Sequence, residues 1–315
     1  MPDNDRVTQE DTLAPTRRTS GPWTSRAARL LWPAAIANLI ANIGIVVTGG
    51  AVRLTGSGLG CPTWPQCSEG SYVPHGELGW HGAIEFGNRL LTFVLVVIAV
   101  GCWAAAVAAK RTGQHGAGRS VLLTTIIALG IPAQAIIGGV TVLTDLNPWI
   151  VAFHLLVSMA IIGVCVVLLD HLRPRRRPAA SRTLQRLVMA TFVVGWAVLY
   201  LGTVVTGSGP HSGDLDSRRT GLDPQMMSHV HAWVVYGLVA LTVAVLVAAR
   251  RADLRVLLGA AVTLLVVELV QGVIGFVQYF NDLPELLVGV HMLGAGLTSA
   301  ALTWVLLAAR RTDPR

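Results

Sequence analysis

The stretch QAIIGGVTVLTDLNPWIVAFHLL, residues 134–156, returns later in the chain as QGVIGFVQYFNDLPELLVGVHML, residues 271–293. The two stretches align without a gap. Self-similarity at a fixed offset is typical of a fold built from repeated units. The shared residues include Gln134 and Gln271, Gly138 and Gly275, Asp145 and Asp282, and His154 and His291. The sequence therefore predicts two copies of one structural unit.

A weaker match extends this repeat toward the beginning of each copy. VVTGG (46–50) corresponds to VVTGS (204–208), and EFGNRLL (85–91) corresponds to SHVHAWV (228–234). The second pair of segments aligns Asn88 with His231. The two copies then cover residues 30–170 and 187–309.

The hydropathy of the sequence indicates that each copy consists of membrane-spanning helices. The chain has 315 residues, of which 53% are hydrophobic and only 13% are charged, which excludes a soluble domain with a single core. A helix needs about 20 apolar residues to cross a bilayer. Eight such runs lie at 30–52, 82–109, 120–144, 149–170, 187–207, 228–249, 256–280 and 285–309.

We therefore predict an all-α integral membrane protein with eight transmembrane helices, arranged as two tandem four-helix bundles. Because each copy has an even number of spans, both copies enter the membrane from the same side. A pseudo-two-fold axis along the membrane normal should relate them.

Basic residues gather on one side of the predicted helices. Of the 24 lysines and arginines, twenty lie in residues 1–29, 110–119, 171–186, 250–255 and 310–315. By the positive-inside rule these segments face the cytoplasm, and both termini do so with them. Because the charges sit in short loops beside membrane helices, we interpret them as topological signals and expect no nucleic-acid partner.

The segments outside the two copies are short and polar. Residues 1–29 contain four acidic residues and lack the apolar core of a signal peptide, so we predict a disordered cytoplasmic tail. Residues 171–186 form a cytoplasmic linker, and residues 310–315 form a second cytoplasmic tail. The acidic residues also argue against an organelle transit peptide, which favours a multi-pass protein of a bacterial plasma membrane.

The four cysteines fall into two kinds. Cys102 and Cys165 lie within membrane helices and are expected to be small apolar fillers. Cys61 and Cys67 lie in the outside loop GSGLGCPTWPQCSEGSYVPHG (56–76), in an oxidising compartment, where a local disulfide is favoured. A metal clip and a redox-active dithiol stay open as alternatives.

Four positions that the repeat aligns, Asn88 with His231 and His154 with His291, are predicted to form one layer near the outer surface. Each lies in the first two turns of an inward-running helix, about 10 Å below the boundary. Polar residues in membrane helices face the bundle interior, and two histidines from facing helices can bind a porphyrin iron from both sides. His229 is a competitor for His231, but it faces about 200° away on the helix. The four positions are Asn88, His154, His231 and His291.

The two halves differ in this layer. His231 and His291 form a complete pair in the second half, whereas His154 in the first half has only Asn88 opposite, a poor ligand for haem iron. Glu85 lies three residues before Asn88 and shares its helix face, so its carboxylate should lie beside the under-coordinated site. There it is a candidate for proton transfer or for stabilising positive charge.

Two arginines have alternative interpretations. Arg89, four residues after Glu85, either neutralises that carboxylate in an ion pair at the helix end or binds a porphyrin propionate. Arg53 either reaches a propionate or extends its side chain to the membrane interface.

Several of these segments together resemble the heme A synthase family. The resemblance covers nearly the whole of residues 30–309, and the combination of motifs is specific, although each motif alone is weak. The matching segments are RLTGSGLGCPTWPQC, IEFGNRLLT, GGVTVLTDLNPWIVAFHLLVSM and VGVHMLGAG.

The resemblance implies a haem b in the second bundle and the substrate haem O in the first. His231 and His291 would then ligate haem b. His154 would face the substrate iron, and Glu85 would be the essential carboxylate. Many family members have a histidine where this chain has Asn88, so no axial ligand is expected from that residue here.

The family reaction oxidises a ring methyl of haem O by successive hydroxylations, and the geminal diol loses water to leave the formyl group of haem A. That product serves the terminal cytochrome oxidase. The expected partners are therefore haem O, haem A, membrane lipid and an unidentified electron donor, with contacts to haem O synthase and cytochrome oxidase assembly factors. The resemblance also implies that Cys61 and Cys67 are the outside-loop pair.

Two other classes of function compete with this interpretation. A non-enzymatic dihaem electron-transfer cytochrome would need haems near opposite faces of the membrane, whereas all candidate ligands lie at one level. A transporter built from repeats would place its site near mid-membrane on broken helices. The apolar centres of the predicted helices count against a transporter.

Overall fold

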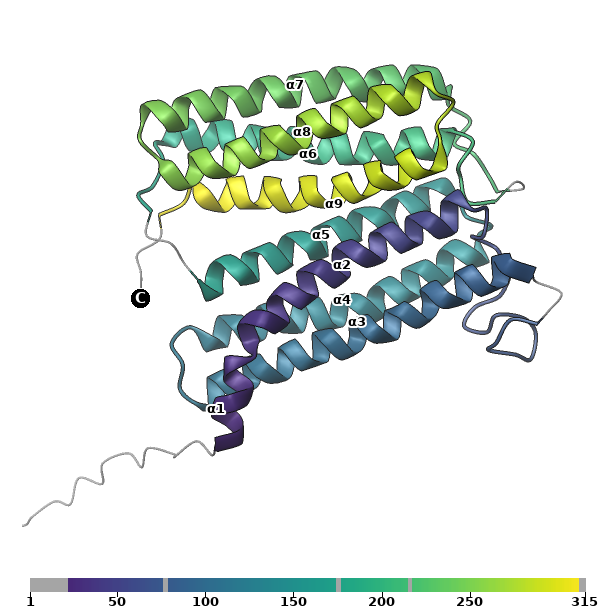
Figure 1. The fold of residues 1–315 in the computed structure, drawn as a ribbon, viewed down its shortest axis with the longest axis horizontal. Coiled ribbons are helices and arrows are strands. Elements are labelled where there is room, and N and C mark those ends of the chain that lie inside the picture. The colour runs from purple at the N-terminus through teal and green to yellow at the C-terminus, as the bar shows by residue number, and fades with distance from the viewer. Residues whose placement is uncertain (1–21, 76–78, 174–176, 215–216, 312–315) are drawn as a thin grey trace, which may run out of the picture.

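The structure, a computed structural model, describes residues 22–75, 79–173, 177–214 and 217–311 (Figure 1). Within these residues the regular structure is helical, apart from one isolated β-bridge between Ser68 and Ser71. The predicted all-α class is confirmed. The helices are α1 (Pro22–Arg29), α2 (Leu31–Leu54), α3 (Gly79–Arg111), α4 (Ala117–Leu143), α5 (Pro148–Leu172), α6 (Arg182–Ser208), α7 (Pro224–Arg251), α8 (Arg255–Phe280) and α9 (Glu285–Ala308).

Eight of these helices, α2 to α9, are long and apolar enough to cross a membrane, which confirms the eight predicted spans. Several of them begin earlier than the apolar runs do, and the difference is largest for α6 and α7. Ser181 caps α6 by accepting from the Leu184 N–H, and Asp223 caps α7 by accepting from the Met226 N–H. Hydropathy marks the part of a helix that meets lipid, whereas the polar cap marks where the helix begins.

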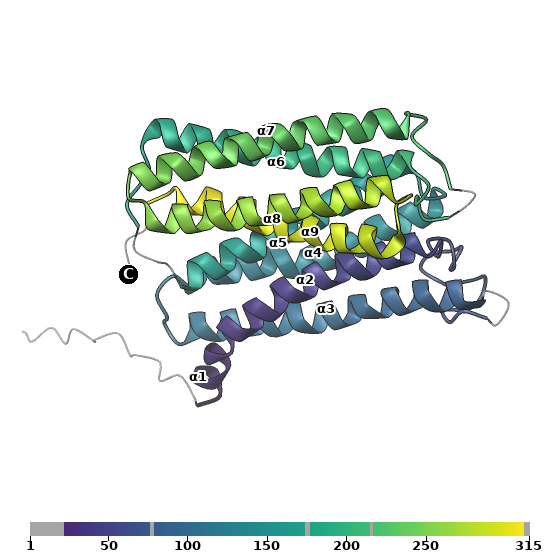
Figure 2. The same cartoon turned by 45° about the horizontal axis from the view of Figure 1, so that its top comes forward.

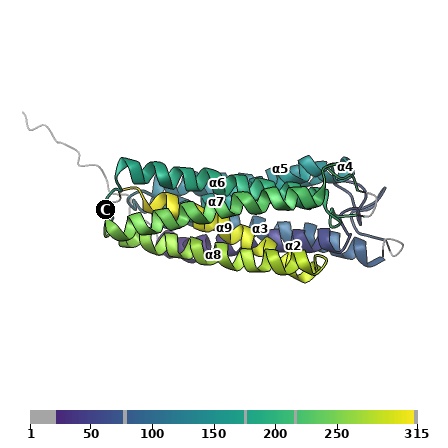
Figure 3. The same ribbon diagram turned by 90° about the horizontal axis from the view of Figure 1, so that it is seen from above.

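The spanning helices form two closed rings (Figures 1 to 3). In one ring α2, α3, α4 and α5 each contact the next, and α5 returns to α2; in the other, α6 to α9 close in the same way. Each ring encloses its own apolar core, and a third cluster around Ile162 and Leu199 lies where α2, α5 and α6 meet. This grouping does not conflict with the predicted halves, and the pseudo-two-fold relation between them stays a prediction.

The turns that join α4 to α5 and α8 to α9 have the same backbone geometry. Asp145 and Leu146 have φ angles of 50° and 54°, and their aligned partners Asp282 and Leu283 both have 56°. Two consecutive residues in the left-handed region, at the same positions of both turns, are unusual because residues other than glycine seldom adopt it. The strong sequence repeat therefore encodes a repeated turn that sets the angle at which α5 and α9 enter their bundles.

The two glutamines that occupy the same position in both copies of the repeat make the same hydrogen bond. Gln134 Nε2 donates to the main-chain carbonyl of His154, and Gln271 Nε2 donates to that of His291, both at 2.9 Å. Hydrogen bonds of this kind between neighbouring helices are a common role of glutamine in membrane proteins. Each bond fixes α5 or α9 against the preceding helix at the level of its histidine.

Residues 22–29 form α1, although the sequence predicted a disordered tail over residues 1–29. This helix contacts α3, and its residue Ala28 is buried in the core of the first ring. Contacts with another element can order a polar segment that lacks enough apolar residues of its own. The rest of the predicted tail lies outside the described residues.

Candidate functional site

Each candidate histidine lies against a glycine of the preceding helix. A methyl group added to that glycine would come within 3.3 to 3.7 Å of the Cε1 atom of the ring. The absence of a side chain at these glycines therefore lets each imidazole lie deep between two helices. The pairs are Gly138 with His154, Gly202 with His231, and Gly275 with His291.

One ring nitrogen of each of these histidines has no hydrogen-bond partner within the described residues. The Nδ1 atoms of His154, His231 and His291 are buried and unpaired. Leaving such a polar atom unsatisfied costs about 1–3 kcal/mol, so the rings are poorly explained as purely structural residues.

The second bundle fits a haem held between two imidazoles. α7 and α9, which carry His231 and His291, lie at opposite corners of its ring of helices. An iron-bound histidine commonly directs Nδ1–H to a main-chain carbonyl or another acceptor while Nε2 binds the metal. The donor set and its unpaired nitrogens therefore suit a haem.

Replacing Gly202 with valine should displace His231 and lower the haem content of the protein. The new side chain would meet the ring at close range, and overpacking of this kind costs about 1–3 kcal/mol, or roughly 5- to 150-fold in affinity. Haem per chain, measured by absorbance after purification, checks this. Gly237→Val is the matched control, because a methyl group at Gly237 of α7 meets nothing within 4 Å. Equal haem loss in both variants would contradict the role of Gly202.

Asn88 occupies the corresponding place in the first bundle but is bound elsewhere. Thr48 Oγ1 of α2 donates to Asn88 Oδ1 at 2.8 Å. Gly44, which aligns with Gly202 when the weaker repeat is extended, has open space around it. The short amide of Asn88 therefore does not fill the space that the His231 ring fills in the second bundle. Of the four positions in the predicted layer, only that of His154 supplies an imidazole to the first bundle.

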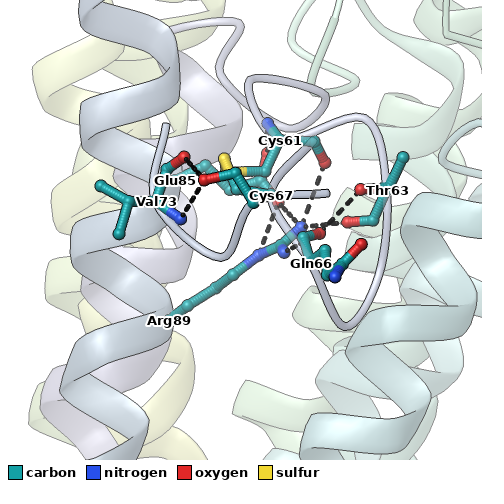
Figure 4. Close-up of a disulfide and its surroundings, with 8 residues drawn as sticks. Cys61, Thr63, Gln66, Cys67, Val73, Glu85 and Arg89 are labelled. Atoms are coloured by element: carbon teal, nitrogen blue, oxygen red, sulfur yellow. Dashed lines mark hydrogen bonds and ion pairs between the residues drawn. A yellow bond between two sulfur atoms is a disulfide. The ribbon is translucent and has the colours of Figure 1, made fainter. Parts of the chain in front are cut away.

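The predicted disulfide between Cys61 and Cys67 is confirmed, with an S–S distance of 2.04 Å (Figure 4). Its loop is bound to α3 through Glu85. The Cys61 N–H donates to Glu85 Oε2 at 2.6 Å, and Arg89 donates to Glu85 Oε1 from Nη2 at 2.6 Å and from Nε at 3.1 Å. Glu85 is buried, and the positive charge of Arg89 balances its negative charge.

Arg89 completes the attachment of the loop (Figure 4). Its guanidinium also donates to three main-chain carbonyls of the loop, at distances of 3.1 to 3.2 Å. The carbonyls belong to Cys61, Thr63 and Gln66. Of the two interpretations of Arg89, the structure shows the ion pair with Glu85. Binding of a propionate by Arg89 stays a prediction, without a contact in this structure to support it.

The disulfide loop covers the end of the first bundle. Trp64 lies against Gly139 of α4, so closely that a methyl group there would overlap the indole. Gly60 lies against the main chain of His81 at the beginning of α3 in the same way. The loop therefore connects α3 to α4, and we call this end of the molecule the loop end.

Replacing both Cys61 and Cys67 with serine should loosen this loop. Removing a cross-link over so short a segment costs roughly 2 kcal/mol in the chain-entropy account, which raises the opening equilibrium constant of the loop about 30-fold. Amide hydrogen exchange of residues 57–75 should rise by that order, while exchange in α8 stays unchanged and provides the internal control. Unchanged exchange in the loop would show that Glu85 and Arg89 hold it without the disulfide.

Arg53 links the two bundles at the loop end. Its Nε donates to the His211 carbonyl at 2.6 Å, and its Nη2 donates to the Thr206 carbonyl of α6 at 3.0 Å. The ring of His211 in turn lies 2.9 Å from the Leu283 carbonyl. These contacts direct the Arg53 side chain toward protein carbonyls of the second bundle and not toward the membrane interface. The propionate role of Arg53 stays a prediction.

The remaining histidines of the loop end lie outside the bundle interiors. His229 is exposed, and its Nε2 lies 3.3 Å from the Tyr279 hydroxyl. His81 Nδ1 lies 3.0 Å from Ser57 Oγ. The structure therefore directs His231 inward and His229 outward on the same helix.

The fold and the site define a class: a helical membrane protein whose bundles present inward-facing histidines suited to haem. The sequence profile of the COX15-CtaA family, described as cytochrome oxidase assembly protein, matches residues 33–210, which is more than half of the chain. The chain belongs to this family, which agrees with the resemblance found in its sequence.

Several relatives named heme A synthase are similar to this chain. The protein of Geobacillus thermodenitrificans is 31% identical over 44% of this chain and 41% of its own length. That of Lysinibacillus sphaericus is 30% identical over 54% of this chain and 56% of its own length. That of Bradyrhizobium sp. is 26% identical over 96% of this chain and 94% of its own length. The chain thus spans about half the length of the first two relatives and nearly all of the third.

Proposed function

We propose that this protein is a heme A synthase, which oxidises a ring methyl of haem O to the formyl group of haem A. The observation that carries the proposal is the asymmetry between two similar bundles. Three of the four aligned positions hold imidazoles against glycines, and the fourth holds Asn88 bound to Thr48. One bundle can thus hold a haem from both sides, and the other can hold a haem from one side.

The second bundle would hold haem b, with the Nε2 atoms of His231 and His291 as axial ligands. A haem b bound there would supply reversible one-electron transfer. Gln271 fixes the main chain at His291, and Gly202 and Gly275 leave room for the two rings. These contacts position both imidazoles in advance, so little ordering is needed when the cofactor binds.

The first bundle would hold the substrate haem O, oriented by His154. Gln134 fixes the main chain at this histidine in the same way as in the second bundle. On the opposite side Asn88 offers no imidazole, which leaves that side of the substrate without a protein ligand. The methyl group would be hydroxylated twice, and each two-electron step would need an oxidant from outside the protein and would insert one oxygen atom into a C–H bond; loss of water from the resulting geminal diol would leave the aldehyde.

Glu85 would serve this reaction from the edge of the bundle. Its two carboxylate oxygens hold the disulfide loop closed over the loop end through Cys61 and Arg89, which limits the entry of water. The same oxygens are the nearest candidates to hold a proton near the substrate. Glu85 thus combines a positioning role that the hydrogen bonds show with a catalytic role that we propose.

We further propose the orientation and location. The loop end would face the outside of a bacterial plasma membrane, and the arginine-rich end, where α5 ends and α6 begins, would face the cytoplasm with both termini. The positive-inside distribution supports this orientation. An outside position of the loop also agrees with its disulfide, since such bonds persist in oxidising compartments.

Expression of the chain in a host that makes haem O but no haem A tests the proposal directly. Pigments are extracted from the membranes and identified by chromatography and mass. We expect haem A with the chain and none with an empty vector. Finding haem O and haem b alone, with the protein present and loaded with haem b, would favour the electron-transfer cytochrome.

A further inference from the structure

A groove opens between the two bundles on the side away from the histidine layer. It has a volume of about 370 Å³, far larger than the roughly 30 Å³ of one water molecule. α2 and α9 lie close together at the loop end and diverge toward the arginine-rich end (Figure 1). The walls are mainly apolar and include Leu39, Val166, Leu169, Val267, Leu297 and Trp304.

The groove is distinct from the candidate haem sites. Leu297 and Trp304 follow His291 by six and thirteen residues in α9, which places them about 9 and 20 Å further along that helix. Its lining comes from α2 and α5 of one bundle and α8 and α9 of the other. An occupant would therefore contact both bundles without approaching the proposed substrate.

The arginine-rich end of the groove carries charged side chains. Arg177 is buried and donates to both oxygens of Asp170 at 2.8 Å, and also to the Arg310 carbonyl. Asp170 is thus neutralised by its partner. The guanidinium of Arg173 lies 4.0 Å above the Trp32 ring of α2 and, within the described residues, pairs with no carboxylate.

Stacking on an aromatic face occupies the plane of a guanidinium and leaves its N–H groups at the edge available. The groove therefore combines an apolar interior with the Arg173 guanidinium at its end. The N–H groups at the edge of this guanidinium are available to an anion. A porphyrin with two propionates would need a wider site and two cations. A phospholipid with one phosphate and an acyl chain matches both parts of the groove.

We propose that this groove binds an anionic phospholipid of the leaflet on the arginine-rich side. The phosphate contacts Arg173, and an acyl chain lies between α2 and α8 against α9. Basic pockets between membrane helices are recognised sites for anionic headgroups. The lipid fills the space where the bundles diverge and supports the contact between them. This proposal does not depend on the proposed catalytic function.

The test uses the purified full-length protein, depleted of lipid in detergent and then titrated with phosphatidylglycerol or phosphatidylcholine under native mass spectrometry. We expect one phosphatidylglycerol to stay bound at collision energies that remove phosphatidylcholine. Arg173→Gln should lower its affinity about fivefold. Arg111→Gln, at the exposed end of α3 on the same side, is the matched control and should leave the affinity unchanged.

A second variant tests the apolar part of the groove. Thr263 lines the groove from α8 and is exposed, so tryptophan at this position fills the space without changing the charge or the core. Thr263→Trp should also weaken phosphatidylglycerol binding. Equal binding of the two lipids, equal losses in the Arg173→Gln and Arg111→Gln proteins, or full binding by the Thr263→Trp protein would each overturn the proposal.

Discussion

The His291→Ala protein should lose its haem b while retaining the helical fold. His231 would remain as a single axial ligand, and the space against Gly275 would be empty. Loss of a residue that hydrogen-bonds to a metal ligand already costs about 10- to 100-fold in affinity, so loss of the ligand itself should cost at least about 100-fold. Haem b per chain, measured from the pyridine haemochrome spectrum, should fall close to zero.

His229→Ala provides the matched control for this experiment. His229 lies two residues from His231 on α7, but it is exposed and contacts Tyr279. Its removal should leave the haem b content unchanged. A normal haem b content in the His291→Ala protein would remove the basis for the second-bundle site, and a loss in the His229→Ala protein would move the ligand to that residue.

The Glu85→Ala protein should make almost no haem A while keeping its haem b. The change removes the carboxylate that accepts from Cys61 and leaves the charge of Arg89 without its partner; breaking a buried ion pair costs about 3–5 kcal/mol. Losing a general acid or base lowers a rate about 100- to 10,000-fold. Haem A formed in the haem O host should therefore fall below about 1% of normal.

The Glu85→Gln protein separates the two roles of this residue. Glutamine can still accept from the Cys61 N–H, but it cannot carry the proton or balance Arg89. If the loop retains normal hydrogen exchange in this variant and haem A is still absent, the carboxylate acts in the chemistry. Glu69→Ala, an exposed acid of the same loop, is the control and should be fully active. Normal haem A formation by the Glu85→Ala protein would contradict both roles.

The helical class and the spans could be predicted from the sequence because both depend on local patterns. Apolar runs of about 20 residues identify spans independently of what they pack against. The gap-free repeat also carried information about geometry, as the matching turns at Asp145 and Asp282 and the matching bonds of Gln134 and Gln271 show.

The partners of the polar residues could not be predicted in the same way. Arg89 and Arg53 donate to main-chain carbonyls of distant segments, and a carbonyl leaves no mark in the sequence because every residue has one. The spacing of Glu85 and Arg89 did allow their ion pair to be expected. Only Gly60 and Gly139, which permit the close contacts of the disulfide loop, could have indicated from the sequence that this loop is attached there.

The predicted helix starts differ from the observed ones for a related reason. α3 begins at Gly79, three residues before the apolar run, which puts Asn88 in the third turn of its helix instead of the first two. α1 was missed because its order depends on contact with α3, and its own sequence is polar. Both errors come from treating hydropathy as a measure of helix extent.

Electron paramagnetic resonance of the purified protein tests most directly the claim that the two bundles hold haem differently. We predict one low-spin signal typical of two imidazole ligands, which disappears in both the His231→Ala and the His291→Ala proteins and persists in the His154→Ala protein. Loss of that signal in the His154→Ala protein, or its survival without His231, would contradict the assignment of the complete ligand pair to the second bundle.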